Sequence, residues 1–205
     1  MAVMMSVRFP LSVRNVEDLL RERGIYISHE TVRYWWIPFG TMFTREIRKK
    51  RHHPSPNYSN WRWHLDEVFV KINGELHYLW RAVDHEGEVL EAYVTKRRNK
   101  RAALKFLRKA MKRYGNPQVI VTDKLRSYRA AMKEIGNANR QETGRWKNNR
   151  CENSHQPFRR REKIMNKFRQ TKSLQKFVAI HSSVHNLFNL ERHVYNRAQF
   201  KENRN

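Results

Sequence analysis

Three carboxylates in this sequence have the surroundings that metal-dependent chemistry requires. Asp66 lies within the apolar stretch "WRWHLDEVFVKI", Asp123 ends the apolar run "PQVIVTD", and Glu152 opens the basic segment "CENSHQPFRRRE". Mg²⁺ prefers hard carboxylate oxygens, and two such ions about 3.5–4 Å apart can activate an attacking oxygen and stabilise a leaving one. If the fold brings these acids together, they could hold metal for phosphoryl transfer on DNA.

Each acid also has a simpler explanation. Asp66 could form a structural salt bridge, because an unpaired carboxylate on an apolar strand face is costly or takes up a proton. Asp123 could cap the turn or helix that follows it. Glu152 could be a local charge partner for the cations around it. On the residues alone these alternatives stay open.

The chain is strongly basic: 43 Lys and Arg stand against 19 Asp and Glu, which gives a formal charge of +24. Such an excess repels itself and indicates a polyanionic partner, in the first place nucleic acid, with acidic membrane surfaces as a weaker alternative. Basic residues that closely follow the candidate acids could hold DNA phosphates without reading the base sequence. They are Lys124 and Arg126 after Asp123, and Arg159, Arg160 and Arg161 after Glu152.

Several features favour a cytoplasmic protein. The single cysteine, Cys151, excludes an internal disulfide and fits a reducing compartment. The sequence has no run of the roughly 18 apolar residues that a membrane span needs. The opening residues "MAVMMSVRF" are too short for the core of a signal peptide.

The elements that would position the acids follow from the hydrophobic pattern. Residues 62–72 alternate between two faces, which predicts a strand. Asp66 shares its face with three β-branched apolar residues, whereas Glu67 points to the other face and is expected to be a surface or support residue. The dipeptide "NG" predicts a hairpin to a second strand over 75–83, and "DHEGE" leads to a third strand over 89–95.

After the third strand the pattern becomes alternately helical and extended. The segment "NKRAALKFLRKAMKRYG" predicts an amphipathic helix that ends at Gly115. The run "PQVIVTD" is typical of a buried parallel strand, with Asp123 at the carboxyl end where ligand sites collect. Helices are predicted from about 127 to 135 and from about 149 onward. This order predicts an α/β fold of the ribonuclease H-like type, a mixed sheet with flanking helices, although other α/β folds share the pattern.

A separate helical region precedes this domain. Residues 1–47 contain two helical segments separated by Gly24, with Ser28 as the N-cap of the second, which is a helix-turn-helix-like outline. We expect Arg33 on the second helix to contact DNA; a plain packing hairpin is the alternative. Residues 48–60 form a basic, proline-containing segment that predicts a linker. Residues 61–205 then make up the predicted catalytic domain.

Five motifs together resemble the DDE-type transposases of bacterial insertion sequences, specifically insertion-sequence family six. They are "WHLDE", "YLWRAVDHEGEVLE", "VTDKLRSY", "NNRCENSHQPFRRRE" and "SVHNLFN". The resemblance implies a ribonuclease H-like domain in which Asp66, Asp123 and Glu152 bind two Mg²⁺ ions, with Mn²⁺ as a substitute. It also implies binding of the element's terminal inverted repeats, cutting of one strand at each end, and joining of the 3′-hydroxyls to target DNA. A homodimer or higher assembly on DNA, associated with the bacterial nucleoid, follows from the need to hold two ends.

His155 lies three residues after Glu152, and so on the same helix face, which makes it a candidate for supporting the metal site. Three features depart from the family pattern: only 28 residues separate Asp123 from Glu152, Cys151 replaces an expected small residue, and the chain begins partway into the expected first helix. A truncated or degenerate copy is therefore one expectation. The rival functions are a catalytically defective copy that only binds DNA, and a nuclease of the same fold that cuts without joining.

Overall fold

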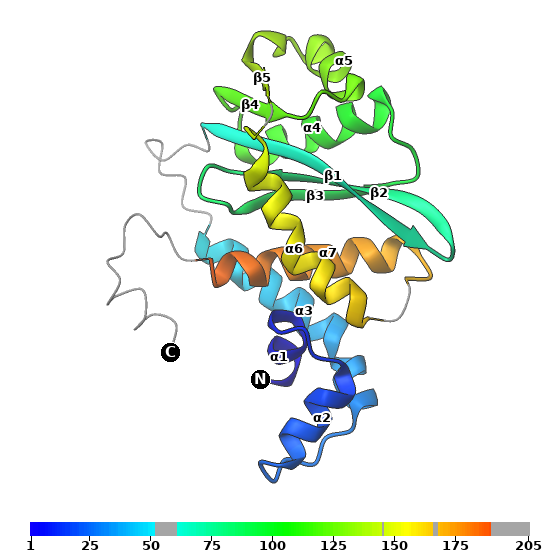
Figure 1. Cartoon of the computed structure of the whole chain (residues 1–205). Helices are drawn as coiled ribbons and strands as arrows, with labels where there is room; N and C mark the ends of the chain where they lie inside the picture. The colour runs from blue at the N-terminus through cyan, green and yellow to red at the C-terminus, as the bar shows by residue number, and fades with distance from the viewer. Residues whose placement is uncertain (52–60, 145, 166–167, 190–205) are drawn as a thin grey trace.

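The computed structural model describes residues 1–51, 61–144, 146–165 and 168–189, and its centre is a five-stranded sheet (Figure 1). The strand order is β3-β2-β1-β4-β5, in which β1 pairs antiparallel with β2 and parallel with β4. The strands are β1 (Arg62–Ile72), β2 (Glu75–Val83), β3 (Val89–Thr95), β4 (Val119–Thr122) and β5 (Gln141–Thr143). The first three match their predicted ranges, and the parallel strand is confirmed, whereas β5 was not predicted. The mixed sheet of the ribonuclease H-like fold is thus confirmed.

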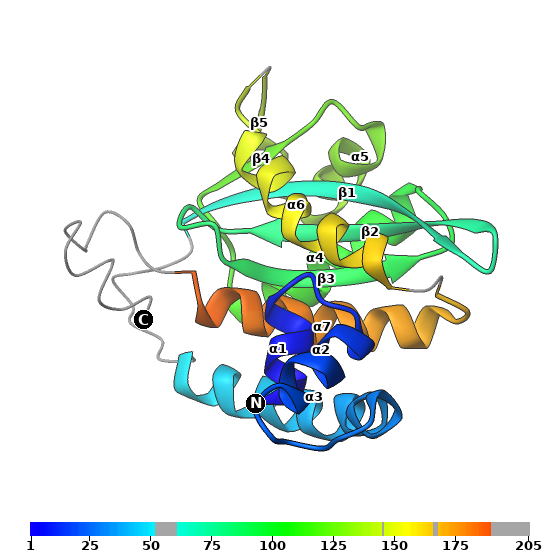
Figure 2. The ribbon, with the colours of Figure 1, turned by 60° about the horizontal axis from the view of Figure 1, so that its bottom comes forward.

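Helices cover both faces of the sheet (Figure 2). On one face α4 (Lys100–Tyr114) and α5 (Arg126–Ile135) pack on a core that includes Trp63 and Leu65 of β1. On the other, α6 (Asn149–Ile164) and α7 (Thr171–Leu187) pack on a core that includes Val68 and Val70 of the same strand. The alternation predicted along β1 is therefore correct, and it gives both faces of the strand a buried environment.

The N-terminal region forms three helices, α1 (Ala2–Arg8), α2 (Val13–Arg21) and α3 (His29–Arg51). Ser12 begins α2 with a reciprocal capping box to Asn15, and the chain turns at Gly24, whose φ is +72°. Ser28 caps α3 as predicted, since its hydroxyl accepts from the Thr31 amide at 3.2 Å. Helix α3 extends through the first four residues of the predicted linker; the remainder, 52–60, lies outside the described residues. Neither α3 nor any other helix in the described ranges is long and apolar enough to cross a membrane.

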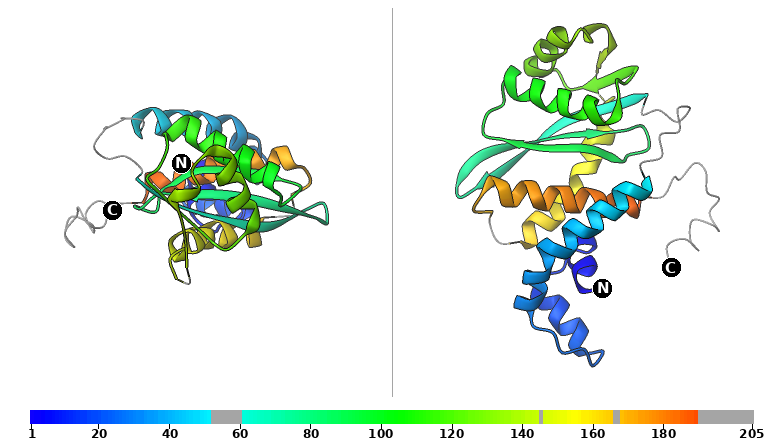
Figure 3. Two further views of the ribbon diagram at one scale, coloured as in Figure 1. Left: turned by 90° about the horizontal axis from the view of Figure 1, so that it is seen from above. Right: turned by 180° about the vertical axis from the view of Figure 1, so that it is seen from behind.

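The N-terminal helices pack against α7, which in turn covers the sheet (Figure 3). Trp36 of α3 stacks on Phe177 of α7 with ring centroids 5.4 Å apart. One turn later Gly40 allows close approach, because a Cβ there would lie 2.7 Å from the Cδ1 of Ile180. Val32 is fully buried, and Trp36 packs against the core between the sheet and α7. The packing of α3 against α7 therefore fixes the position of the helix-turn-helix-like region relative to the sheet.

Candidate active site

The pairing of two parallel strands brings Asp66 and Asp123 together. Leu65 of β1 lies opposite Thr122 of β4 in the last pair of this ladder. The next residues in the two strands' directions, Asp66 and Asp123, therefore lie side by side. Oxygen atoms of Asp66, Glu67 and Asp123 all lie within 4.8 Å of one another. The group sits at the carboxyl end of β4, at the place where α/β sheets bind ligands.

Asp66 is largely buried, and its electrostatic surroundings are unfavourable for a carboxylate. Burial raises the pKa of Asp66 to about 7, and the negative charges of Glu67, Asp123 and Glu152 add to the effect. The Glu67 amide donates to Asp66 Oδ1 at 2.9 Å, which offsets part of it. A buried carboxylate whose pKa is raised by neighbouring carboxylates belongs to a donor set that a divalent cation can neutralise, so these residues fit a hard metal ion.

Glu67 takes a larger part in this group than the sequence suggested. Its side chain is 2% exposed and forms an ion pair with Arg98, whose Nη2 also lies 3.8 Å from Asp123 Oδ2. The expectation of a surface residue is therefore wrong, and the alternative of a support residue fits. The available signal was that a central strand of an α/β sheet is covered on both faces. Arg98 lies in the basic run "KRRNKR", which gave no reason to single out one cation.

Glu152 lies in the first turn of α6, which is attached to the sheet beside Asp66. Asn148, immediately before the helix, donates from Nδ2 to the carbonyl oxygen of Leu65 at 2.9 Å. The Sγ of the buried Cys151 lies 3.8 Å from the carbonyl oxygen of Arg81 on β2. The Glu152 side chain is exposed and is not part of the group of three carboxylates, although its charge contributes to the raised pKa of Asp66.

His155 faces the acidic group from the next turn of α6. Its Nδ1 lies 3.7 Å from Asp66 Oδ2, which is too long for a direct hydrogen bond. Burial lowers the pKa of His155 to about 3, with further effects from the positive charges of Arg81 and Arg159. The ring is therefore neutral at physiological pH and borders Asp66 without adding charge.

Arg81 is a buried cation that was not among the predicted site residues. It lies opposite Asp66 in the β1–β2 ladder and is 1% exposed. Its Nε and Nη1 have no hydrogen-bond partner among the described residues. Burial lowers the pKa of Arg81 to about 10, so it stays charged near neutral pH. The visible signal was an arginine inside the otherwise apolar strand "LWRAV".

The candidate DNA-contacting residues have different surroundings. Lys124, Arg126 and Arg160 are exposed. Arg159 pairs with Glu162 at 2.5 Å, and the exposed Arg33 pairs with Glu30 at 2.7 Å. Arg161 is 4% exposed and donates to the carbonyl oxygen of Leu11, so it connects α6 to the segment before α2.

Comparison with known proteins assigns this arrangement to a family. A family model described as a DDE domain, of the IS240 transposase type, matches residues 60–191. The chain is 32% identical over 161 residues to the transposase for insertion sequence-like element IS431mec of Staphylococcus aureus, covering 76% of this chain and 70% of the relative. The chain belongs to the DDE transposases of insertion sequences. The resemblance to insertion-sequence family six is confirmed.

A second transposase and a solved structure are also similar to this chain. The transposase for insertion sequence element IS257 in transposon Tn4003 of Staphylococcus aureus is also 32% identical, over 76% of this chain and 70% of its own length. Among solved structures, the chain is similar to the HTLV-2 integrase catalytic core domain in complex with magnesium, trimeric form. The TM-score is 0.46 at 16% identity, over 69% of this chain and 92% of that one. As a DDE transposase, the chain is a polynucleotidyl transferase that catalyses transposition.

Proposed function

We propose that this transposase cuts and joins DNA at a site formed by Asp66, Asp123 and Glu152. The observation that supports it most strongly is the β1–β4 register, which places Asp66 beside Asp123. The attachment of Asn148 to Leu65 brings the first turn of α6 to the same place. Two Asp on neighbouring parallel strands and one Glu at the start of a nearby helix are the ligands that the chemistry needs.

The three acids would hold two Mg²⁺ ions, with Mn²⁺ as a substitute. When bound, such ions activate an attacking water or 3′-hydroxyl and stabilise the leaving oxygen. Glu152, exposed on the first turn of α6, supplies the ligand from the helix side. Arg98 holds Glu67 and approaches Asp123, so it orients two members of the acidic group. His155, neutral and beside Asp66, limits the rotation of that carboxylate.

The substrates are the terminal inverted repeats of the element and target DNA. Lys124 and Arg126 follow Asp123 closely in the chain, and Arg159 lies further along α6 from Glu152. These residues would hold backbone phosphates, which positions DNA without reading its sequence. We assign sequence reading to residues 1–47, with Arg33 on α3, and the chemistry to residues 61–205. Because two ends must be joined to one target, the protein acts as a homodimer or a larger assembly on the bacterial nucleoid.

Strand cleavage and joining are tested with supercoiled plasmid and labelled element ends, in Mg²⁺ or EDTA. Wild type is compared with Asp123→Asn and with the matched control Glu134→Gln, which removes a carboxylate from the exposed face of α5. We expect metal-dependent cleavage and joining in the wild type and the control, and neither in Asp123→Asn. DNA binding without cleavage in all three proteins would show a defective copy, and cleavage without joining would show a nuclease.

A further inference from the structure

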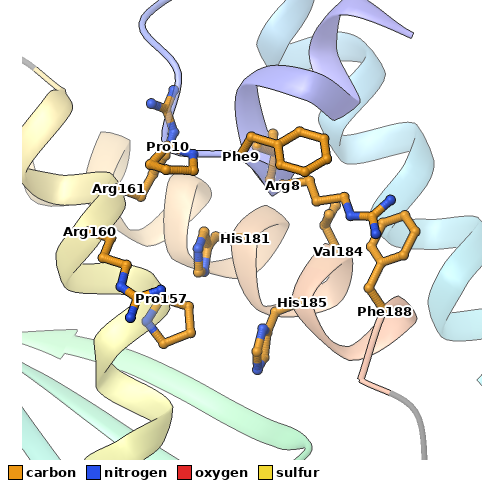
Figure 4. A pocket seen from close by; sticks show the side chains of 11 residues that line it. Arg8, Phe9, Pro10, Pro157, Arg160, Arg161, His181, Val184, His185 and Phe188 are labelled. Carbon is orange, nitrogen blue, oxygen red and sulfur yellow. The ribbon is translucent and has the colours of Figure 1, made fainter. Parts of the chain in front are cut away.

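A second site lies at the junction of the N-terminal helices and the catalytic domain. A cavity of about 240 Å³ opens between the end of α1, the second half of α6 and the last turns of α7 (Figure 4). Among the described residues that line it, every polar side chain is cationic or an imidazole. The polar residues are Arg8 from α1, Arg160 and Arg161 from α6, and His181 and His185 from α7. Since a water molecule occupies about 30 Å³, the cavity can admit a small hydrated anion.

Two buried nitrogen atoms of residues that line the cavity have no hydrogen-bond partner in the described ranges. Arg161 is 4% exposed, and its Nε has no hydrogen-bond partner among the described residues, although Nη1 donates to Leu11. His181 is 6% exposed, and its Nδ1 is likewise without a partner in the described ranges. Buried polar groups are nearly always hydrogen-bonded, so two unpartnered ones in a single cavity indicate a ligand or ordered water there.

Within the described ranges, the three arginines that line the cavity have no acidic partner. No ion pair joins Arg8, Arg160 or Arg161 to a carboxylate within the part of the chain that the structure describes. Burial lowers the pKa of His181 to about 3, and the positive charges of Arg81, His185 and Arg161 lower it further. The guanidinium of Arg8 lies against the ring of Phe188, 3.7 Å from its centroid, across the cavity from Arg160 (Figure 4). The cavity therefore favours an anion.

We propose that this cavity binds one backbone phosphate of the DNA substrate, clamped between Arg8 of α1 and Arg160 of α6. The inference rests on the proposed function, because DNA must lie along α6. Arg160 follows Glu152 by eight residues, which is about 12 Å along the helix. At about 3.4 Å per nucleotide, the clamped phosphate lies roughly three to four nucleotides from the scissile one. DNA would thus join the N-terminal helices to the catalytic domain.

Phosphate-neutralisation interference tests the clamp directly. Duplexes of an element end, each with one phosphate replaced by a neutral methylphosphonate, are bound in EDTA so that no cleavage occurs. Arg8→Gln/Arg160→Gln removes two exposed cations and leaves the buried Arg161 and His181 in place. The matched control is Arg101→Gln/Lys112→Gln, which removes two exposed cations from α4 on the opposite face of the sheet.

For the wild type we expect one neutralised phosphate, a few nucleotides from the cleavage point, to weaken binding roughly tenfold. In the Arg8→Gln/Arg160→Gln protein, neutralising that phosphate should no longer weaken binding, and the effect at the other positions should equal that in the wild type. The slope of log affinity against log salt concentration should become shallower by about the contribution of one phosphate. The control should give the wild-type profile. A profile in Arg8→Gln/Arg160→Gln that equals the wild type at every position would overturn the proposal.

A second experiment tests whether the cavity binds a phosphate of DNA or a free phosphate ion. Inorganic phosphate is titrated into the DNA-free protein while the ring signals of His181 and His185 are followed by NMR. We expect shifts only at millimolar phosphate, because a single free ion lacks the attachment that the duplex provides. Micromolar binding combined with an unchanged interference profile would make the cavity a free-phosphate site and overturn the clamp. Intact DNA binding without cleavage would contradict the proposed catalytic site alone.

Discussion

The two ends of α6 border buried charge of opposite sign. At its start, Asp66, Glu67 and Asp123 gather within 4.8 Å of one another, and burial with mutual repulsion raises the pKa of Asp66 to about 7. Along its second half, Arg160 and Arg161 border a cavity whose described lining contains no acid. Each region leaves charge for a ligand to neutralise: a cation at the first, a phosphate at the second. Uncompensated charge of this kind concentrates at functional sites.

The two regions are built in different ways. The acidic group depends on backbone register, because β1 and β4 fix Asp66 and Asp123 side by side. The cationic cavity depends on side chains from three helices, whose packing is set by contacts such as Trp36 on Phe177. The sheet should therefore keep the acidic group intact when helix packing loosens, whereas the cavity should be disturbed.

The largest effect should come from Asp66→Asn. Removing this carboxylate should lower the rate of metal-dependent cleavage by roughly 10³-fold or more, because charge stabilisation at the reacting phosphate is lost. Affinity for DNA in EDTA should stay the same or rise, since a negative charge has been removed. Single-turnover cleavage and binding, measured on one labelled duplex, check both. Arg8→Gln/Arg160→Gln should show the opposite pattern, and a parallel loss of binding and cleavage in both proteins would contradict the separation of the two sites.

The next largest effect should come from Trp36→Ala. Loss of the stacked ring on Phe177 should lower the free energy of unfolding by about 3 kcal/mol, at the low end for a large aromatic residue because Trp36 is only partly buried. Urea unfolding measures this, with Tyr34→Ala as a control on the same helix, where the side chain is 79% exposed. Affinity for DNA should fall while affinity for Mn²⁺ stays within about twofold. An equal loss of affinity for DNA and for Mn²⁺ would mean that the cavity and the acidic group do not respond independently to helix packing.

A smaller effect on activity is expected for Glu67→Gln. Without its charge, Arg98 loses its ion pair and no longer positions Asp123, which should reduce metal affinity or activity by roughly 10–100-fold. The telling measurement is the Mn²⁺ concentration for half-maximal cleavage, which should rise, whereas a purely structural role would lower only the melting temperature. At the partner position, Arg98→Lys should retain part of the wild-type activity, because it keeps a positive charge beside Glu67, whereas Arg98→Gln should lose it. An unchanged metal dependence would exclude this positioning role.

The sequence predicted the fold better than it predicted the details of the site. Strands β1 to β3 are locally encoded by alternation and by "NG" and "DHEGE" turns, so their ranges were predicted correctly. The short β5 follows a brief 3-10 helix and has three residues, too few for a period to be visible. The extension of α3 past residue 47 was missed because the basic run and the prolines suggested a linker, and the packing on α7 that supports the helix is a long-range feature.

For the site, the sequence indicated Asp66 and Asp123 as candidates, because acids at or within apolar strands are conspicuous. Glu67 and Arg98 required tertiary information, since their pairing joins residues on separate elements. The run of arginines predicts a phosphate contact for Arg161 and gives no sign that its side chain is buried. Its burial against Leu11 depends on how the N-terminal segment crosses α6, which no local pattern encodes.

The smallest effect, and the one that compares the two regions most directly, is the pH dependence of stability without metal. The folded pKa of Asp66, about 7, lies above its ordinary value of 3.8, so the folded state binds the extra proton. This contribution is fully present below pH 3.8 and is lost as the pH rises towards 7. His181, with a folded pKa of about 3, has the opposite sign, because its contribution is lost as the pH falls from 6.5.

Subtracting the stability of Asp66→Asn from that of the wild type, at each pH between 4 and 8, isolates the carboxylate. The difference should become less favourable to the wild type as the pH rises, by about 1–2 kcal/mol after allowance for partial exposure. Mg²⁺ should remove this slope, because a bound cation favours the ionised carboxylate. Inorganic phosphate should leave it unchanged. If phosphate altered the Asp66 slope as strongly as Mg²⁺ did, the two ends of α6 would form one electrostatic site, and their description as separate cation and anion sites would be wrong.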